Sequence, residues 1–127
     1  MVTRMAQRNI KREELQTTLN KIKEKITKDE FRICPRFKNE EFKRKFRLTK
    51  KDHFKPILLN LTCNDFDKCD NEEQPELFGE GMVYIFIKEY RLQNITGMFE
   101  YPRIYIKIKI PNIEGDLPII SFHECAY

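Results

Sequence analysis

Side chains able to transfer protons and bind phosphate alternate with aliphatic residues near the C-terminal end of the chain. In the segment 101–111, four isoleucines alternate with the polar residues Arg103, Tyr105, Lys107 and Lys109. In the segment 117–124, Ile120 and Phe122 alternate with Ser121 and His123. Because successive side chains of a strand point to opposite faces, each segment predicts a strand with one apolar face and one polar face.

Such a polar face has the groups that RNA cleavage without a metal ion requires. The 2′-hydroxyl must lose a proton, the charge on the pentavalent phosphorane must be stabilised, and the 5′-oxygen must gain a proton. His transfers protons near neutral pH, Lys and Arg stabilise phosphate charge, and Tyr can stack on a base or donate a proton. A half-exposed antiparallel sheet is also often rich in Tyr and Lys, so the pattern alone leaves both interpretations open.

The helices that would support this sheet are predicted in the N-terminal half. Apolar residues three and four apart indicate a helix over residues 10–28. Asn39 is a candidate N-cap for a short helix over 40–46. A capping pattern beginning at Thr49 predicts a third helix, in which Pro56 should cause a kink. A second capping pattern, at Thr62 and Asp65, predicts a turn over 64–68.

The strands are predicted mainly after residue 80. Residues 31–34 form a short early strand that ends at a proline, and the acidic segment 70–80 is a predicted loop. Three longer strands follow, over 81–90, 102–110 and 118–124, with an extended hairpin connection at 91–101. Consecutive strands with short links pair antiparallel. The sequence therefore predicts a single α+β domain over 1–127, with a flexible basic arm at 1–9, a mainly helical part at 10–68 and a sheet at 81–124.

The faces of the predicted sheet are assigned by alternation. The stripes Val83/Ile85/Ile87, Ile104/Ile106/Ile108 and Ile120/Phe122 are expected to face the helices. The opposite face then collects the following residues: Tyr84, Phe86, Lys88, Arg103, Tyr105, Lys107, Lys109, Ser121 and His123. This assignment depends on strand register, which the sequence leaves open.

Composition and charge restrict the class of protein. The 127 residues are 40% hydrophobic and 35% charged, which is typical of an ordered globular domain. Residues 1–56 carry 18 Lys or Arg against 8 Asp or Glu, whereas residues 57–127 carry 6 against 12. The basic half suggests a polyanionic partner such as nucleic acid, or an acidic protein, although solvated helix faces would give the same excess.

The cysteines, the histidines and the apolar segments indicate which sites and locations are not expected. The four cysteines include no CxxC pair and only two histidines are present, so neither a metal site nor a cofactor is predicted. The cysteines are expected to be reduced and mostly buried. The first residues contain no apolar run of a secretion signal and no segment is long enough to span a membrane, so a cytoplasmic location is expected.

Five segments together resemble a known family in order and spacing over residues 12–127. They are Phe31–Asn39, Leu61–Lys68, Tyr84–Glu89, Ile104–Lys109 and Ile120–Glu124. The family is that of the MqsR-like toxins of bacterial type II toxin–antitoxin systems. The resemblance implies a RelE-like α+β fold and a metal-independent endoribonuclease that cleaves mRNA, inhibits translation and is neutralised by a cognate antitoxin.

The resemblance also implies roles for individual residues. His123 would be the general acid or base, and Tyr105 would stack on a base or relay a proton. Lys68 and Lys107 would stabilise the phosphate. Members of the family have a further polar residue on the preceding strand, where this chain has Ile85 at the nearest position, and Lys88 is the candidate replacement for it. Candidate substrate-binding residues are Arg103, Lys109 and Tyr84.

Two other classes of function stay open at this point. A non-catalytic RNA-binding domain of the same fold would bind RNA in a salt-sensitive way without cleaving it. A protein-interaction module would use its basic half to bind an acidic protein and would have no affinity for RNA at physiological salt.

Overall fold

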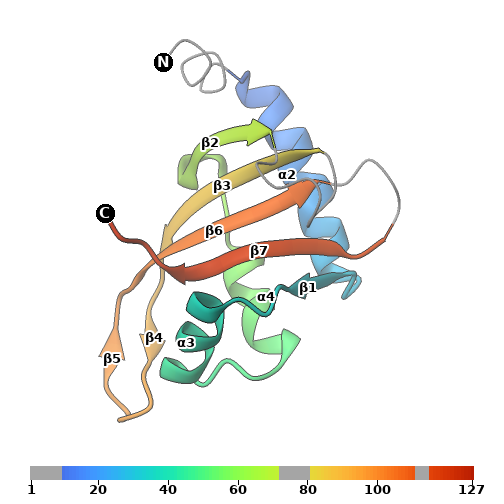
Figure 1. Ribbon diagram of the computed structural model, residues 1–127. Coiled ribbons are helices and arrows are strands. Elements are labelled where there is room, and N and C mark those ends of the chain that lie inside the picture. The colour runs from blue at the N-terminus through green and yellow to red at the C-terminus, as the bar shows by residue number, and fades with distance from the viewer. Residues whose placement is uncertain (1–9, 72–80, 111–114) are drawn as a thin grey trace.

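A computed structural model describes residues 10–71, 81–110 and 115–127 of the chain. Three α-helices and one 3₁₀ helix lie in this part of the chain, together with a five-stranded twisted sheet and a small two-stranded hairpin (Figure 1). The helices are α2 (Arg12–Thr27), α3 (Phe37–Lys45), α4 (Lys51–Leu59) and η1 (Cys63–Asp65). The strands are β1 (Phe31–Ile33), β2 (Phe66–Asn71), β3 (Met82–Glu89), β4 (Leu92–Gln93), β5 (Phe99–Glu100), β6 (Arg103–Ile110) and β7 (Leu117–Glu124).

The main sheet has the strand order β1-β7-β6-β3-β2. The pairs β2–β3, β3–β6 and β6–β7 are antiparallel, and only the short β1 is parallel to its neighbour β7. Strands β4 and β5 form a separate hairpin in the predicted 91–101 connection. The predicted α+β class, with N-terminal helices against a mostly antiparallel sheet, is confirmed.

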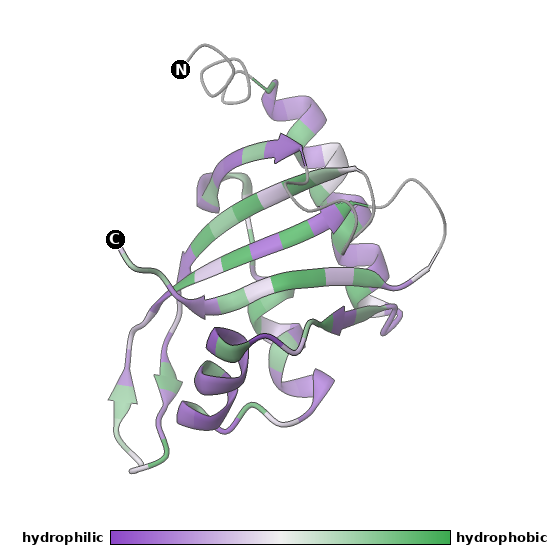
Figure 2. Ribbon diagram, in the orientation of Figure 1, coloured by the Kyte–Doolittle hydropathy of each residue, from purple (hydrophilic) through white to green (hydrophobic). Residues whose placement is uncertain are grey.

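One face of the sheet packs against helices, as Figure 1 shows with α2 and α4 behind the strands. Helix α2 buries the apolar stripe Leu15, Leu19, Ile22 and Ile26, which confirms the helix predicted over 10–28. These side chains share one core cluster with Phe54 of α4 and with Phe86, Ile106 and Phe122 of the sheet. Bands of hydrophobic and hydrophilic residues alternate along β6 in Figure 2, as the sequence pattern requires.

The sheet register overturns the predicted orientation of β3. Phe86 pairs with Ile106, which in turn pairs with Phe122, and directly paired residues share a face of the sheet. Phe86 therefore faces the helices, and the predicted stripe Val83/Ile85/Ile87 lies on the opposite face. The prediction was wrong because β3 is apolar on both faces, so that alternation alone could not tell one face from the other.

A bulge in β7 corrects a second face assignment. Lys107 pairs with Ser121, but the next residue, Ile108, pairs with Ile119, which leaves Ile120 as the extra residue. The bulge allows both Ile119 and Phe122 to join the main core, whereas Ile120 packs in a separate small cluster. Ile120 was predicted to face the helices and does not, whereas Phe122 faces them as predicted.

Three local predictions were wrong and one was confirmed. Asn39 is not an N-cap but lies fully buried inside α3, whose N-cap is Arg36. Helix α4 begins after Lys50 rather than Thr49, and residues 66–71 form β2 where a turn and a loop were predicted. The predicted capping box of Thr62 and Asp65 is present around η1. The predicted flexible arm at 1–9 and most of the acidic loop lie outside the described residues.

Candidate functional site

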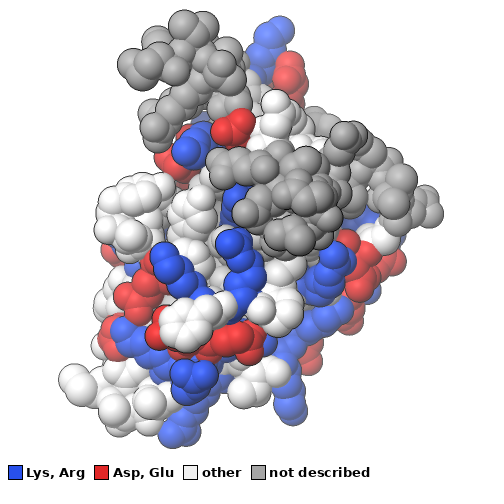
Figure 3. Space-filling model, viewed as in Figure 1, with Lys and Arg blue, Asp and Glu red and all other residues white. Residues whose placement is uncertain are grey.

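We use the term open face for the face of the sheet that lies opposite α2 and α4. Direct pairing across β2, β3, β6 and β7 places in its middle Lys68, Ile85, Ile87, Tyr105, Lys107, Ser121 and His123. The same pairing places Asp70, Val83 and Lys109 at one end of this face and Glu89 and Arg103 at the other. Lys and Arg side chains gather over the middle of the sheet and around α3 in Figure 3, which views the molecule from this side. The open face is therefore a surface where a basic patch and the two candidate proton-transfer groups occur together.

Tyr105 and His123 form the centre of the open face. They lie directly opposite each other on β6 and β7, and their rings stack with centroids 5.4 Å apart and planes 24° apart. Both side chains are half-buried, so each ring has limited freedom but remains accessible. The predicted juxtaposition of these two residues on one face is confirmed.

The hydrogen bond of the His123 ring determines which nitrogen can exchange a proton with a ligand. Nδ1 lies 2.9 Å from the backbone oxygen of Glu124. A carbonyl oxygen can only accept, so Nδ1 must carry the proton in this contact. The neutral ring then presents Nε2 as a base, and the protonated ring presents Nε2–H as an acid.

Two lysines flank this pair in the next row across the sheet. Lys68 on β2 pairs with Ile85, Ile85 pairs with Lys107 on β6, and Lys107 pairs with Ser121 on β7. With strands about 4.8 Å apart, the Cα atoms of Lys68 and Lys107 are roughly 10 Å apart. Two flexible lysine side chains at that separation can converge on one phosphate between them. The structure thus brings Lys68, Tyr105, Lys107 and His123 to one face.

The bulge that orients His123 is held by a buried asparagine of α3. The Asn39 side-chain amide donates to the backbone oxygens of Cys34 and Ile120, both at 2.9 Å, and its oxygen accepts from the Phe122 backbone N–H at 2.8 Å. Because β1 ends at Ile33, Asn39 supplies the hydrogen bonds that a continued strand would have made along the edge of β7. Asn39 therefore fixes the backbone on the N-terminal side of His123.

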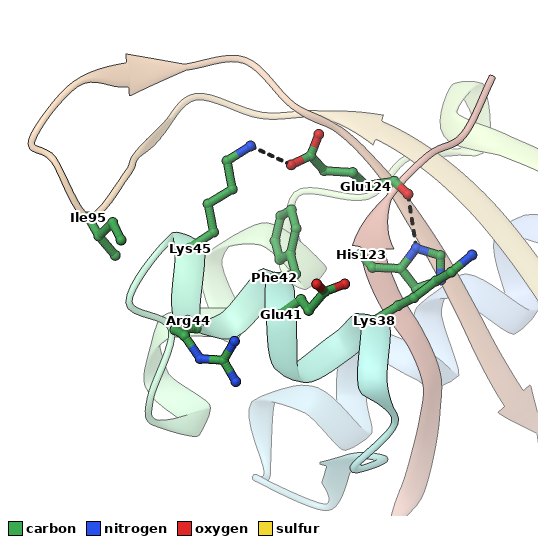
Figure 4. Close-up of a pocket in the computed structure, with 8 residues that line it drawn as sticks. All are labelled: Lys38, Glu41, Phe42, Arg44, Lys45, Ile95, His123 and Glu124. Atoms are coloured by element: carbon green, nitrogen blue, oxygen red, sulfur yellow. Dashed lines mark hydrogen bonds and ion pairs between the residues drawn. The ribbon is translucent and has the colours of Figure 1, made fainter.

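Helix α3 adds charged residues that the sequence analysis did not assign to the site. A cavity of about 450 Å³ lies between α3 and the end of β7, lined by Lys38, Glu41, Arg44, Lys45, His123 and Glu124 among others (Figure 4). Lys45 donates to Glu124 at 2.7 Å, and this hydrogen bond raises the pKa of the Lys45 amine. A second cavity of about 330 Å³ also includes His123 and Lys38, with Arg36, Phe37 and Ser121. The basic run around Phe37 was the signal that could have found these residues.

Lys88 does not belong to this arrangement, contrary to the prediction. It pairs with Ile104, a fully buried core residue, and therefore lies on the helix-packed face. Its amine forms an ion pair with Asp65 of η1 at 3.4 Å, in which both side chains are about one-sixth exposed. Asp65 also accepts from the Thr62 backbone N–H at 2.8 Å. Lys88 thus fixes η1 to the sheet.

The predicted substrate-binding residues fall into three different positions. Tyr84 pairs with Ile108 and packs against the main core, so it does not lie on the open face. Lys109 pairs with Val83 but only 1% of it is exposed, so it presents no surface to a substrate. Arg103 follows the alternation of Tyr105 and Lys107, is exposed, and donates to the backbone oxygen of Tyr127.

The middle of β3 is apolar on the open face. Ile87 lies directly opposite Tyr105, and Ile85 lies directly opposite Lys107. Glu89, at the end of β3, lies opposite Arg103 on the same face and is exposed. Next to Tyr105 and Lys107, the proton-transfer groups therefore come from β6 and β7 and not from β3.

The cysteines are mostly buried, as predicted. Cys34, Cys63 and Cys69 are buried, Cys125 is half-buried, and no disulfide joins any of the four. Burial raises the pKa of the Cys69 thiol. Among the described residues, no cluster of His, Cys, Asp and Glu side chains has the makings of a metal site.

Comparison with known proteins identifies no relative. The chain matches no protein-family model, no curated protein and no solved structure. Within the described ranges, none of the helices combines the length and the apolar character needed to cross a membrane.

Proposed function

We propose that this protein is a metal-independent endoribonuclease of the toxin class, which cleaves mRNA at the open face of its sheet. The observation that supports this proposal is the stacked Tyr105–His123 pair, with Lys107 and Lys68 in the adjacent row. The MqsR-like motif order adds the toxin context, in which a cognate antitoxin protein neutralises the enzyme.

The proposed reaction uses the 2′-hydroxyl of the substrate as the nucleophile. That oxygen loses its proton and attacks the adjacent phosphorus, the bond from phosphorus to the 5′-oxygen breaks, and the 5′-oxygen takes up a proton. The products are a 2′,3′-cyclic phosphate and a 5′-hydroxyl. His123 Nε2 is the proton-transfer atom, because Nδ1 is engaged with the Glu124 carbonyl.

The other residues of the open face have electrostatic and positioning roles in this proposal. Lys107 and Lys68 stabilise the extra negative charge of the phosphorane. Tyr105 stacks on a base or relays a proton beside His123. Lys88 has no part in the reaction, because it lies on the opposite face and pairs with Asp65.

A non-catalytic RNA-binding domain is the second candidate, and one observation favours it. Cleavage moves two protons, and opposite Tyr105 and Lys107 strand β3 supplies only the apolar side chains of Ile87 and Ile85. A surface with a single imidazole could bind RNA through its lysines without cutting it.

Incubation of the purified protein with mRNA in EDTA distinguishes the two candidates. The ribonuclease cleaves under these conditions, and His123→Ala reduces the rate by about a hundredfold or more, the usual effect of removing a general acid or base. A matched control is His53→Ala, since His53 is exposed at the start of α4 and is remote in sequence from the open face. Intact RNA with the wild type, or equal cleavage by wild type and His123→Ala, would reject the ribonuclease.

A further inference from the structure

We propose that Arg36, Phe37 and Lys38, at the start of α3, form a subsite that binds one nucleotide of a single-stranded RNA beside His123. In this subsite the Phe37 ring stacks on a base and the two cations hold the flanking phosphates. The inference rests on the proposed function for its substrate class and deepens that function by placing the substrate's path.

Phe37 is the most exposed large hydrophobic side chain in the described part of the chain. It is 77% exposed, whereas the other two phenylalanines of this region, Phe42 and Phe46, are almost fully buried. Burial of an aromatic ring stabilises a fold, and Phe37 gains little of that stabilisation. Its ring is therefore available for a partner outside the fold.

The position of Phe37 connects it to the centre of the open face. It lines the cavity of about 330 Å³ together with Arg36, Lys38 and His123. Arg36 Nη1 lies 3.4 Å from Ser121 Oγ, and Ser121 pairs directly with Lys107. A chain of polar groups thus runs from Lys107 across β7 to the exposed ring.

Lys38 joins this cavity to the neighbouring one. It lines both cavities, as His123 does, and Figure 4 shows its side chain pointing away from α3 toward the His123 ring. It forms no ion pair with any described residue. Its charge can therefore bind a phosphate of the RNA strand where the strand continues from His123 toward α3.

An exposed aromatic ring between two cations suits single-stranded nucleic acid. Bases stack on aromatic rings with little dependence on sequence, because every base has a π-face, and adjacent cations follow the phosphates. Beside His123 the open face offers the half-buried Tyr105 ring, the lysines Lys68 and Lys107 and the aliphatic Ile87, whereas Ile85 is buried. Phe37 is thus the exposed aromatic ring on which a base can stack when it lies outside the scissile position.

Binding of a short, labelled, single-stranded 2′-O-methyl oligonucleotide tests the subsite separately from cleavage, because the methyl group blocks the attacking oxygen. Phe37→Ala should weaken binding about tenfold, as expected for the loss of one stacked base, and Phe37→Tyr should stay within about twofold of wild type. The matched control is Tyr101→Ala, since Tyr101 is 62% exposed and lies at the base of the β4–β5 hairpin.

An abasic substitution identifies the stacked base. Removing that base from the oligonucleotide should weaken binding to the wild type about tenfold and should have no further effect on Phe37→Ala. Lys38→Ala should lower the slope of log affinity against log salt by about 0.7, the value for one phosphate contact on a single strand. Lys21→Ala, an exposed lysine of α2, should leave the slope unchanged.

The outcomes separate this inference from the proposed function. Equal affinities of wild type and Phe37→Ala, or no binding by the wild type, would overturn the subsite whether or not the wild type cleaves RNA. Binding that depends on Phe37 without cleavage of unmodified RNA would uphold the subsite and reject the ribonuclease. Thermal denaturation of each variant verifies that the fold is intact.

Discussion

Replacement of Asn39 tests how the fold positions His123. The Asn39 side chain is fully buried and makes three hydrogen bonds to backbone groups on either side of the β7 bulge. Asn39→Ala removes all three. The Cys34 oxygen keeps a second donor, the Arg36 backbone N–H at 2.9 Å, so it is not left unsatisfied.

The expected loss of stability follows from the two groups left without that partner. These are the Ile120 oxygen and the Phe122 N–H, and each buried unsatisfied backbone group costs about 1–3 kcal/mol. We therefore expect Asn39→Ala to lower the free energy of unfolding by about 2–6 kcal/mol. Asn39→Asp should be no better, because a carboxylate cannot donate to either carbonyl.

Urea denaturation followed by circular dichroism measures this loss, and equal m-values verify that the compactness of the unfolded state is unchanged. Asn20→Ala, an exposed asparagine of α2, is the control and should stay within about 0.5 kcal/mol of wild type. The ring signals of His123 should shift in Asn39→Ala while those of His53 do not. A loss below about 1 kcal/mol, or an unchanged His123 signal, would refute the assignment of Asn39 as the support of this site.

Three further predictions concern other parts of the fold. Lys88→Met should lower the free energy of unfolding by about 1–2 kcal/mol, because it breaks a largely buried ion pair, and should leave RNA cleavage unchanged. A loss of cleavage at full stability would show that Lys88 belongs to the site. Gly81→Ala should destabilise the protein by about 2 kcal/mol in urea denaturation, because Gly81 has φ +138° and a Cβ there would lie 2.7 Å from a backbone oxygen of β6. The hydrogen bond from Asn94, and then the charge of Lys45, lower the pKa of Glu100 below its ordinary value of 4.5. The ionised Glu100 carboxylate therefore stabilises the fold above that value, and this stabilisation is lost as the pH falls through the folded-state pKa. The drop in melting temperature between neutral pH and about pH 3 should be smaller in Glu100→Gln than in the wild type.

The polar face of β6 could be predicted from the sequence because its alternation is strict. Isoleucines occupy one parity and Tyr105 and Lys107 the other, so only one orientation buries the aliphatic side. The helix α2 was predictable for the same reason. Both elements carry one apolar face, and burial then determines the orientation.

The parts that could not be predicted depend on long-range pairing. β3 is apolar on both faces, so the side of Lys88 was decided by its pairing with Ile104 and by the ion pair with Asp65. β2 has no hydrophobic alternation and forms a strand through its hydrogen bonds with β3. The β7 bulge depends on Asn39, whose residue type favours an N-cap when only local sequence is considered.

The contribution of α3 to the candidate site was missed for a related reason. Arg36 and Lys38 are far from His123 in sequence. They reach the site because β1 pairs with β7 and places α3 beside the end of β7. No local signal predicts that pairing. The sequence shows only a basic run that contains an aromatic residue, and it does not reveal that the Phe37 ring is exposed between these cations.

Attack of the 2′-hydroxyl, which we propose for the open face, fixes the chemistry of the cleaved RNA ends. Mass spectrometry of RNA incubated with the protein in EDTA should find 2′,3′-cyclic phosphate and 5′-hydroxyl ends, which His123→Ala should nearly abolish. RNA that stays intact, or fragments with 5′-phosphate and 3′-hydroxyl ends, would rule out this reaction, because attack by the 2′-hydroxyl produces neither.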